Sequence, residues 1–263
     1  MTVPVKLKNK HVERKQRRFL LRLLVARDFK GRYKRAALGV LWSMLSPLCT
    51  FAAQAIIFSI FFDRGEHYIS YLIVGNIAYH MFTDVTTNGM FSISANSGIL
   101  SSVKVEKHLF LLSKCLSSGI NFLLMTLIMF GIVAYDGIQF HLGFFNLVYP
   151  AICLFIFSTG IALILSVLFV FFKDIQYIYS VFTRILIYFS ALFYYVDRFP
   201  ENIQKYFYCN PVYCYIYYFR CIILDNTLPE IPIIILCTVL PILSVSVGMI
   251  VFRLNEKKFV YYF

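Results

Sequence analysis

Charged residues are scarce in this sequence. Asp, Glu, Lys and Arg make up 14% of its 263 residues, whereas 60% are hydrophobic and the mean hydropathy is +0.73. Soluble domains carry about 25% charged residues. The shortage of charge argues against a soluble globular chain and indicates an integral membrane protein.

Several signatures of catalysis and of metal binding are missing as well. There is no G-x-x-x-x-G-K-[ST] string to hold phosphate, and neither D-x-D nor H-x-x-x-x-D, which a membrane glycosyl- or acyltransferase would use. The seven cysteines lack metal-ligand spacing, although a disulfide among Cys209, Cys214 and Cys221 stays open. No cleavage site of a signal peptide follows the basic N-terminus. We therefore expect no enzyme, no metal and no cofactor in this chain.

Long uncharged runs divide the sequence into segments that can cross a membrane. A spanning helix needs about 20 apolar residues. This length predicts an all-α membrane protein, a single domain over residues 1–263, with six spans at 36–62, 68–90, 114–135, 147–171, 175–196 and 231–252. The uncharged run before Lys173 exceeds one span, so we expect part of 137–146 to lie at the membrane interface or to re-enter.

The basic residues are distributed unevenly around these spans. With a cytoplasmic N-terminus and six alternating spans, 20 of the 25 Lys and Arg lie inside. Only Arg64, Arg198, Lys205 and Arg220 lie outside, and Arg184 falls within a span. This asymmetry predicts that both termini are cytoplasmic. Because topology and contact with lipid headgroups explain the excess of cations, we expect no nucleic-acid partner.

The N-terminal 35 residues are expected to form a cytoplasmic tail and an amphipathic helix over 14–35. Leu21, Val25, Phe29 and Tyr33 recur every four residues, with basic side chains on the opposite face. This pattern is typical of a helix that lies in the membrane interface. Asp28 precedes Arg32 by four residues, a spacing that favours an ion pair within the helix.

A specific motif joins this helix to the first span. Residues 27–48 read RDFKGRYKRAALGVLWSMLSPL and resemble the corresponding stretch of ABC transporter permeases that export polysaccharides, approximately R-D-x-K-x-R-Y-x-x-x-x-L-G-x-x-W-x-x-x-x-P. The segments 94–113, 171–194 and 210–224 resemble the same family in the same order. The resemblance covers most of the chain.

The resemblance implies a permease subunit in a bacterial cytoplasmic (inner) membrane. Two copies would form a passage, and two copies of a separate ATPase, which binds ATP and magnesium, would drive a lipid-linked polysaccharide of the O-antigen, capsule or teichoic acid type outward. The segment 96–108 would be a short coupling helix, whose alternative is an ordinary loop. The expected ATPase-coupling residues are Arg27, Asp28, Lys30, Arg32, Gly98, Ile99, Lys104, Glu106 and Lys107.

The passage and an external gate are expected from the same resemblance. Passage residues are Trp42, Ser43, Phe51, Phe58, Arg184 and Tyr188. Arg184 falls near the middle of the bilayer, so we expect it to face the bundle, a wet passage or an acidic partner, either to contact a phosphate of the substrate or as a structural group. Short gate helices are expected in 197–230. The expected gate residues are Tyr194 and Tyr195, just before this region, and Pro200, Tyr206 and Tyr213 within it, although dense tyrosines also form interfacial belts.

Two departures from the family pattern concern the partner contact and the gate. The usual K-x-x-F-P-R is KVEKHLF here, without proline, and the usual Ser-Pro pair in the fifth span is Ser190-Ala191, so we expect no proline bend there.

The alternative function is an ATP-independent secondary transporter or flippase of a glycolipid. Against it, no second copy of the first-span motif marks an internal repeat.

Overall fold

The fold is known from a computed structural model that describes residues 10–33, 41–61, 67–102 and 106–262; the side chains of 10–14, 32–33, 41, 43–44, 59–61, 101–102 and 260–261 are not described. All regular secondary structure in these ranges is helical, which confirms the expected all-α class. The helices are α1 (Lys10–Tyr33), α2 (Leu41–Phe61), α3 (Tyr68–Phe91), α4 (Ser97–Ser102), α5 (His108–Tyr135), α6 (Val148–Phe171), α7 (Ile175–Phe189), α8 (Glu201–Phe207), α9 (Pro211–Ile223) and α10 (Ile231–Asn255). Short 3-10 turns occupy Ser94–Asn96, Leu142–Leu147, Val196–Arg198 and Lys258–Tyr261.

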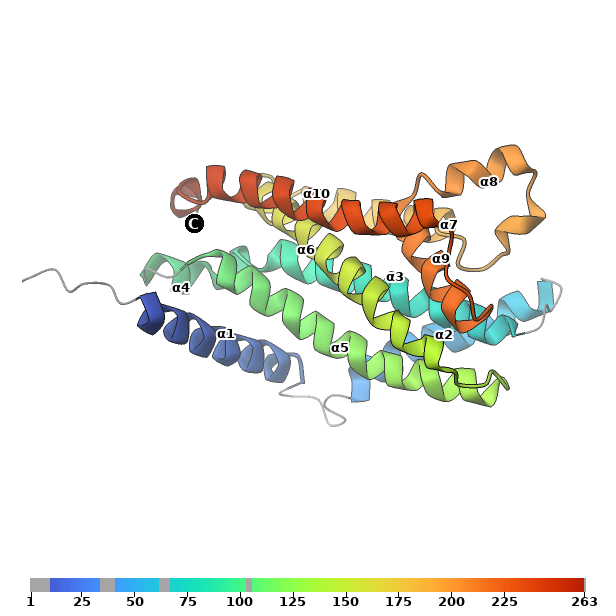
Figure 1. The fold of residues 1–263 in the computed structure, drawn as a ribbon. Helices are drawn as coiled ribbons and strands as arrows, with labels where there is room; N and C mark the ends of the chain where they lie inside the picture. Colours follow the sequence, from blue (N-terminus) through green and yellow to red (C-terminus); the bar gives the residue numbers. More distant parts are fainter. Residues whose placement is uncertain (1–9, 34–40, 62–66, 103–105, 263) are drawn as a thin grey trace, which may run out of the picture.

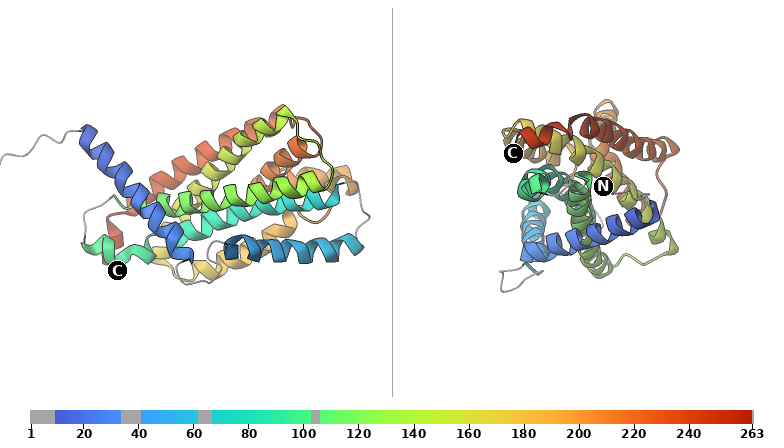
Figure 2. Two further views of the ribbon diagram at one scale, coloured as in Figure 1. Left: turned by 90° about the horizontal axis from the view of Figure 1, so that it is seen from below. Right: turned by 90° about the vertical axis from the view of Figure 1, so that its left-hand side faces the viewer.

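The long helices form an elongated bundle (Figure 1). α3 packs against α5, α6 and α9, and α10 packs along α6. α1 lies against α5 and runs at a steep angle to the other long helices (Figure 2). The start of α1, the short α4 and the C-terminus lie at one end of the bundle, here called the α4 end, and α8 lies at the other, the α8 end.

Three of the described helical segments are long and apolar enough to cross a membrane. They are His108–Tyr135, Leu142–Phe171 and Ile231–Asn255. Two shorter apolar helices, Leu45–Phe58 and Ile175–Phe189, coincide with parts of the predicted first and fifth spans, and α3 coincides with the second. The exact number of six spans stays a prediction, and residues 36–40 of the first span lie outside the described ranges.

The predicted fifth span is wrong at its end. α7 stops at Phe189, and Ala191 adopts a left-handed backbone with φ 48°, so the chain does bend at Ser190-Ala191 although no proline is present. The following residues Ala191, Leu192 and Phe193 are buried without helical hydrogen bonding. In a membrane, irregular backbone of this kind is tolerated only where protein surrounds it.

The other predicted span boundaries lie closer to the ends of the helices. α5 begins at His108 rather than at residue 114, so the helix extends beyond the predicted span toward the α4 end. Residues 137–146 form a turn and most of the 3-10 turn before α6. The seven cysteines are all free, so no disulfide forms among Cys209, Cys214 and Cys221.

Glycine allows α6 and α10 to approach closely. A Cβ atom added at Gly160 would lie 2.4 Å from the backbone of Ser244, and one at Gly248 would lie 2.5 Å from the Gly160 carbonyl oxygen. Small residues at helix contacts increase the packing that holds membrane helices together, because lipid supplies no hydrophobic force between them. These contacts hold α10 on the bundle.

A carboxylate joins α5 to α3 at the α8 end. Asp136, directly after α5, accepts hydrogen bonds from the backbone N–H of Ser70 at 3.2 Å and from its hydroxyl at 2.6 Å. Ser70 lies in the first turn of α3, where N–H groups lack partners within the helix and negative charge is favoured. Asp136 thereby caps α3 and fixes the two helices together.

Candidate functional site

The first candidate site is the contact between α1 and α5. The buried face of α1 contains Leu24 and also the carboxylate of Asp28, each 6% exposed. Asp28 accepts hydrogen bonds from Ser113 at 2.8 Å and Arg27 at 2.9 Å, and its Oδ1 lies 3.2 Å from the Lys114 ammonium. The carboxylate therefore binds α1 to α5, a role that helical periodicity alone did not predict.

Arg27 extends this contact to the predicted coupling segment. Its Nη2 donates to the side-chain oxygen of Asn96 at 2.8 Å, in the turn directly before α4. Asn96 is itself buried and donates to the Ser92 carbonyl oxygen at the end of α3. Arg27 and Asp28, adjacent in the sequence, thus connect α1 to two different elements.

The other predicted coupling residues divide into three groups. Gly98 and Ile99 are exposed on α4, and Lys30 is exposed on α1. Glu106 and Lys107 are half-buried just before α5. The side chain of Arg32 and all of Lys104 lie outside the described residues, so the Asp28–Arg32 ion pair stays a prediction.

The end of the coupling segment is fastened to α1 and α10. Glu106 forms an ion pair with Arg17, and Lys107 donates to the backbone oxygen of Glu256 while its ammonium lies 5.4 Å from the Phe259 ring centre. Burial lowers the pKa of the Lys107 ammonium, an effect that the charge of Glu256 opposes. A polar cavity of 620 Å³ opens here, lined by Arg17, Glu106, Lys107, His108, Met249, Phe252, Arg253, Glu256 and Lys257.

The predicted passage residues differ widely in burial. Phe51 is buried, and Phe58 stacks on Phe193 with ring centres 4.5 Å apart. Trp42 and Tyr188 are exposed by 50% and 60%. The side chain of Ser43 lies outside the described residues.

Arg184 does not face the bundle, which corrects one of the expectations for it. Its side chain is exposed on α7, a helix in which only Tyr179 is buried. The helix packs loosely on α6 and turns most of its apolar side chains outward, among them Ile178, Val181 and Ile185. A wet passage or an acidic partner beside Arg184 stays a prediction.

The second candidate site is formed by a buried arginine, Arg220. The sequence analysis placed this residue only among the external cations. Arg220, in α9, is 4% exposed. Its guanidinium donates to the backbone oxygens of Ala191 at 3.0 Å, Leu192 at 3.3 Å and Tyr71 at 3.3 Å, and lies 3.4 Å from the Tyr71 ring centre. A Cβ at Gly75 would lie 2.6 Å from this group, so glycine provides its space.

Two tyrosines of α3 complete the hydrogen bonds of the bent segment after α7. The Tyr68 hydroxyl donates to the Phe193 carbonyl oxygen at 2.8 Å, and the Tyr71 hydroxyl donates to that of Tyr194 at 2.7 Å. Together with Arg220 they supply donors to four successive carbonyl groups, from Ala191 to Tyr194. Buried carbonyls need such partners because water is excluded.

Tyr194 ends this segment, and the other predicted gate residues follow it along the chain. Tyr194 and Tyr195 are half-buried, Pro200 directly precedes α8, and Tyr206 is 75% exposed on α8. Tyr213 is 3% exposed and packs against Phe207, so it belongs to the core of the gate region rather than to its surface. The short helices α8 and α9 lie within the predicted region 197–230.

These features define a helical membrane protein in which Arg27 and Asp28 of one helix hold the turn before α4 and the helix α5. The chain belongs to the family of ABC-2 type transporters, whose model matches residues 20–224. This match includes Arg27, Asp28 and the whole Arg220 site, and it confirms the resemblance found in the sequence.

Curated relatives are similar over most of the chain. The O-antigen export system permease protein RfbA of Klebsiella pneumoniae is 28% identical over 242 residues, covering 91% of this chain and 93% of the relative. The polysialic acid transport protein KpsM of Escherichia coli is 22% identical, with 89% and 92% covered. The capsule polysaccharide export inner-membrane protein CtrC of Neisseria meningitidis is 22% identical, with 70% and 71% covered.

The α1–α5 contact predicts that Asp28→Asn loosens the packing of α1 on α5. Loss of the carboxylate leaves Lys114 without its ion-pair partner and weakens hydrogen bonds to a charged group, which contribute about 1.5–3 kcal/mol. We expect backbone amides of α1 to exchange hydrogen about 10- to 100-fold faster. Asp197→Asn, an exposed carboxylate at the α8 end, is the matched control. Unchanged exchange in Asp28→Asn would contradict this role.

The Arg220 site predicts that even a conservative substitution there lowers the stability of the fold. Arg220→Lys keeps the charge, but a point-like ammonium cannot reproduce the planar fork that reaches three carbonyls and stacks on Tyr71. We expect a loss of about 2–4 kcal/mol in the free energy of unfolding, measured by denaturant titration in detergent. The control is Arg198→Lys, at an exposed arginine at the α8 end. Equal stability of the two variants would show that Arg220 does not hold the segment.

Proposed function

We propose that this chain is the permease subunit of an ATP-driven exporter of lipid-linked polysaccharide, of the O-antigen, capsule or teichoic acid type. The observation that carries the proposal is the family match over 20–224, together with export permeases as relatives along nearly the whole chain. The chain itself acts as a channel-forming subunit, and a separate ATPase with bound ATP and magnesium supplies the energy.

The proposed complex contains two copies of this chain. The exposed face of α7 supports this assembly, since it combines apolar side chains such as Phe182, Ile185 and Tyr188 with Arg184. A cation at membrane depth is costly against hydrocarbon. Packing α7 toward a second copy, with a wet passage between them, gives Arg184 a polar environment in which to contact substrate phosphate.

The proposed orientation places the α4 end in the cytoplasm, with both termini. Support comes from the gathering of cations at this end, including Arg17, Lys107, Arg253 and Lys257, as expected for the cytoplasmic side. The gate region with α8 and α9 would then face outward. Its exposed tyrosines, such as Tyr206, offer rings for contact with sugar.

The ATPase would act on the exposed surface of α4 and α1. Ile99 is 42% exposed on α4, an unusual position for an apolar side chain at a cytoplasmic end and a suitable contact for a partner. Movement of α4 would reach α1 through Asn96 and Arg27, and α5 through Asp28. Nucleotide states shift this unit only if the ATPase contacts it differently in each state.

The test is co-purification of the tagged chain with its ATPase from the native membrane in mild detergent. We expect a stoichiometric ATPase whose ATP turnover rises when lipid-linked glycan is added. Recovery of the chain alone under several detergent conditions, or transport driven by a proton gradient without ATP, would contradict the proposal and favour the secondary transporter or flippase.

A double variant tests the coupling role of the basic helix. Arg27→Ala with Arg32→Ala removes the bond to Asn96 and a second motif cation, so we expect export to fall severalfold at normal expression. The control is Arg198→Ala at the opposite end, measured by polysaccharide on the cell surface. Normal export in the double variant would exclude α1 as a coupling element.

A further inference from the structure

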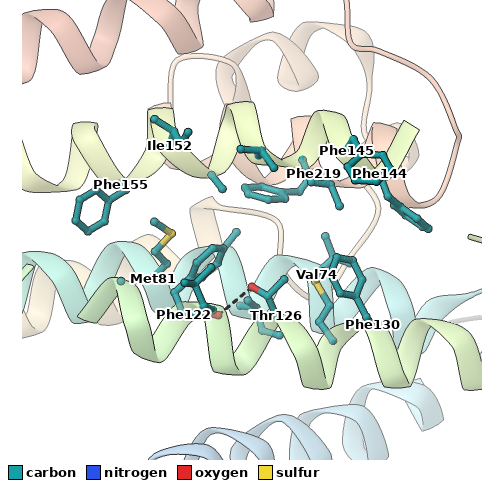
Figure 3. A pocket seen from close by; sticks show the side chains of 18 of the residues that line it. Val74, Met81, Phe122, Thr126, Phe130, Phe144, Phe145, Ile152, Phe155 and Phe219 are labelled. Carbon is teal, nitrogen blue, oxygen red and sulfur yellow. Dashed lines mark hydrogen bonds between the residues drawn. The ribbon is translucent and has the colours of Figure 1, made fainter. Parts of the chain in front are cut away.

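Two of the cavities formed by the described residues differ in what they offer to an occupant. The groove between α5 and α6 has a volume of 820 Å³ and is lined by apolar side chains such as Phe122 and Phe155 (Figure 3). Because the hydrophobic effect is non-directional, walls of this kind select no particular occupant. The polar cavity at the α4 end instead carries charges that define the chemistry of what binds there.

The polar cavity has more positive than negative charge on its lining. Four of its side chains are cationic and two are carboxylates, which leaves a net charge of +2 when its histidine is neutral. The cations come from different elements, namely Arg17 of α1, Lys107 before α5, Arg253 of α10 and Lys257 after α10. The carboxylates are Glu106 and Glu256. The excess of positive charge attracts an anion into a space that several elements enclose.

The four cations differ in the partners that the chain gives them. Arg17 pairs with Glu106, and Lys107 donates to a backbone oxygen. Arg253 and Lys257 are exposed and form no ion pair with any described residue. A guanidinium has five N–H donors, so Arg17 also keeps donors for a second acceptor. Two cations of the α10 side and part of a third on α1 are therefore available to one anion.

The cavity lies where the end of α10 meets the membrane surface. α10 is long and apolar enough to span a membrane, and its 25 residues extend about 37 Å at about 1.5 Å each. This length exceeds the ~30 Å hydrocarbon core, which places Arg253 at the level of the lipid headgroups. Leu243, Val247 and Ile250, which precede it along α10, are 59%, 43% and 59% exposed. An acyl chain following this apolar face would bring its headgroup to the cavity.

We propose that the polar cavity binds the phosphate group of an anionic lipid or of a soluble phosphate compound, and that this phosphate connects α1 to α10. Arg253 and Lys257 bind its oxygens from the α10 side, and Arg17 binds them from α1. A phosphate fits because its acceptor oxygens point in several directions, toward cations that converge from different elements. Basic pockets between membrane helices bind anionic headgroups in this way. The apolar face of α10 favours a lipid as the source, and the site depends on neither export nor orientation.

The experiment uses the full chain in a neutral detergent and measures hydrogen exchange of backbone amides by mass spectrometry. Short-chain phosphatidylglycerol is the lipid source of phosphate, glycerol phosphate is the soluble source, and a galactosyl diacylglycerol without phosphate is the control. We expect phosphatidylglycerol to slow exchange in residues 15–23 of α1 severalfold, because the anion joins Arg17 to α10. The galactolipid should have no effect. An equal effect of glycerol phosphate at the same concentration would support the site and assign it to a soluble phosphate compound.

Three variants test the cations one at a time. Arg253→Gln and Lys257→Gln each remove one charge from the α10 side, so each should raise about tenfold the phosphatidylglycerol concentration that gives half of the protection. The matched control is Lys258→Gln, which removes a neighbouring exposed charge that does not line the cavity and should leave this concentration unchanged. All three side chains are exposed, so the fold should tolerate each change.

Three results would overturn the proposal. The first is exchange in α1 that neither phosphate compound slows, or that the galactolipid slows equally, since phosphate would then have no part in it. The second is protection by phosphatidylglycerol that stays undiminished in both Arg253→Gln and Lys257→Gln, because the lipid would then bind elsewhere. The third is protection that appears only when the ATPase is added, which would assign the cavity to that partner.

Discussion

The arrangement at the α8 end depends on the buried guanidinium of Arg220. The chain leaves α7 inside the bundle, and four consecutive carbonyl groups from Ala191 to Tyr194 lose the partners that a continuing helix would give them. Arg220 and the tyrosine hydroxyls of α3 replace those partners. Without them the bend would expose unpaired carbonyls to hydrocarbon, which a membrane protein cannot tolerate. α3, α7 and α9 are therefore held as one body at this end.

Charged side chains join several helices at the α4 end. Asp28 joins α1 to α5, Arg27 joins α1 to Asn96, and Lys107 joins the start of α5 to α10. Phe259, after α10, also packs its ring against Phe171 and Phe252, with ring centres 6.3 Å and 5.5 Å apart. These side chains thus link α1, the turn before α4, α5 and α10 at this end.

The sequence predicted elements whose limits are set by local chemistry. The spans 68–90, 147–171 and 231–252 lie within about three residues of α3, α6 and α10, because apolar runs there stop at polar or charged residues. The end of α7 was not predictable, since Ala191–Tyr195 is as apolar as a span and its bend depends on Arg220, 29 residues away. Asp28 looked like a surface residue because its partners Ser113 and Lys114 lie on another helix.

The candidate site residues were likewise predictable only where local sequence determines them. The Arg-Asp pair was recognisable as a motif, but its contact with Asn96 required the fold. The depth of Arg184 in α7 was predicted, whereas the face on which it lies depends on how loosely α7 packs.

The central claim is that α1 and α4 move as one unit when the proposed ATPase changes state. The most direct measurement is the distance between spin labels at the exposed Leu23 and Ile99, together with the Ile99–Ile99 distance between two copies, in the complex with and without ATP. The account predicts a constant distance within each chain and a change between the copies. A change within the chain, with the copies unmoved relative to each other, would contradict it.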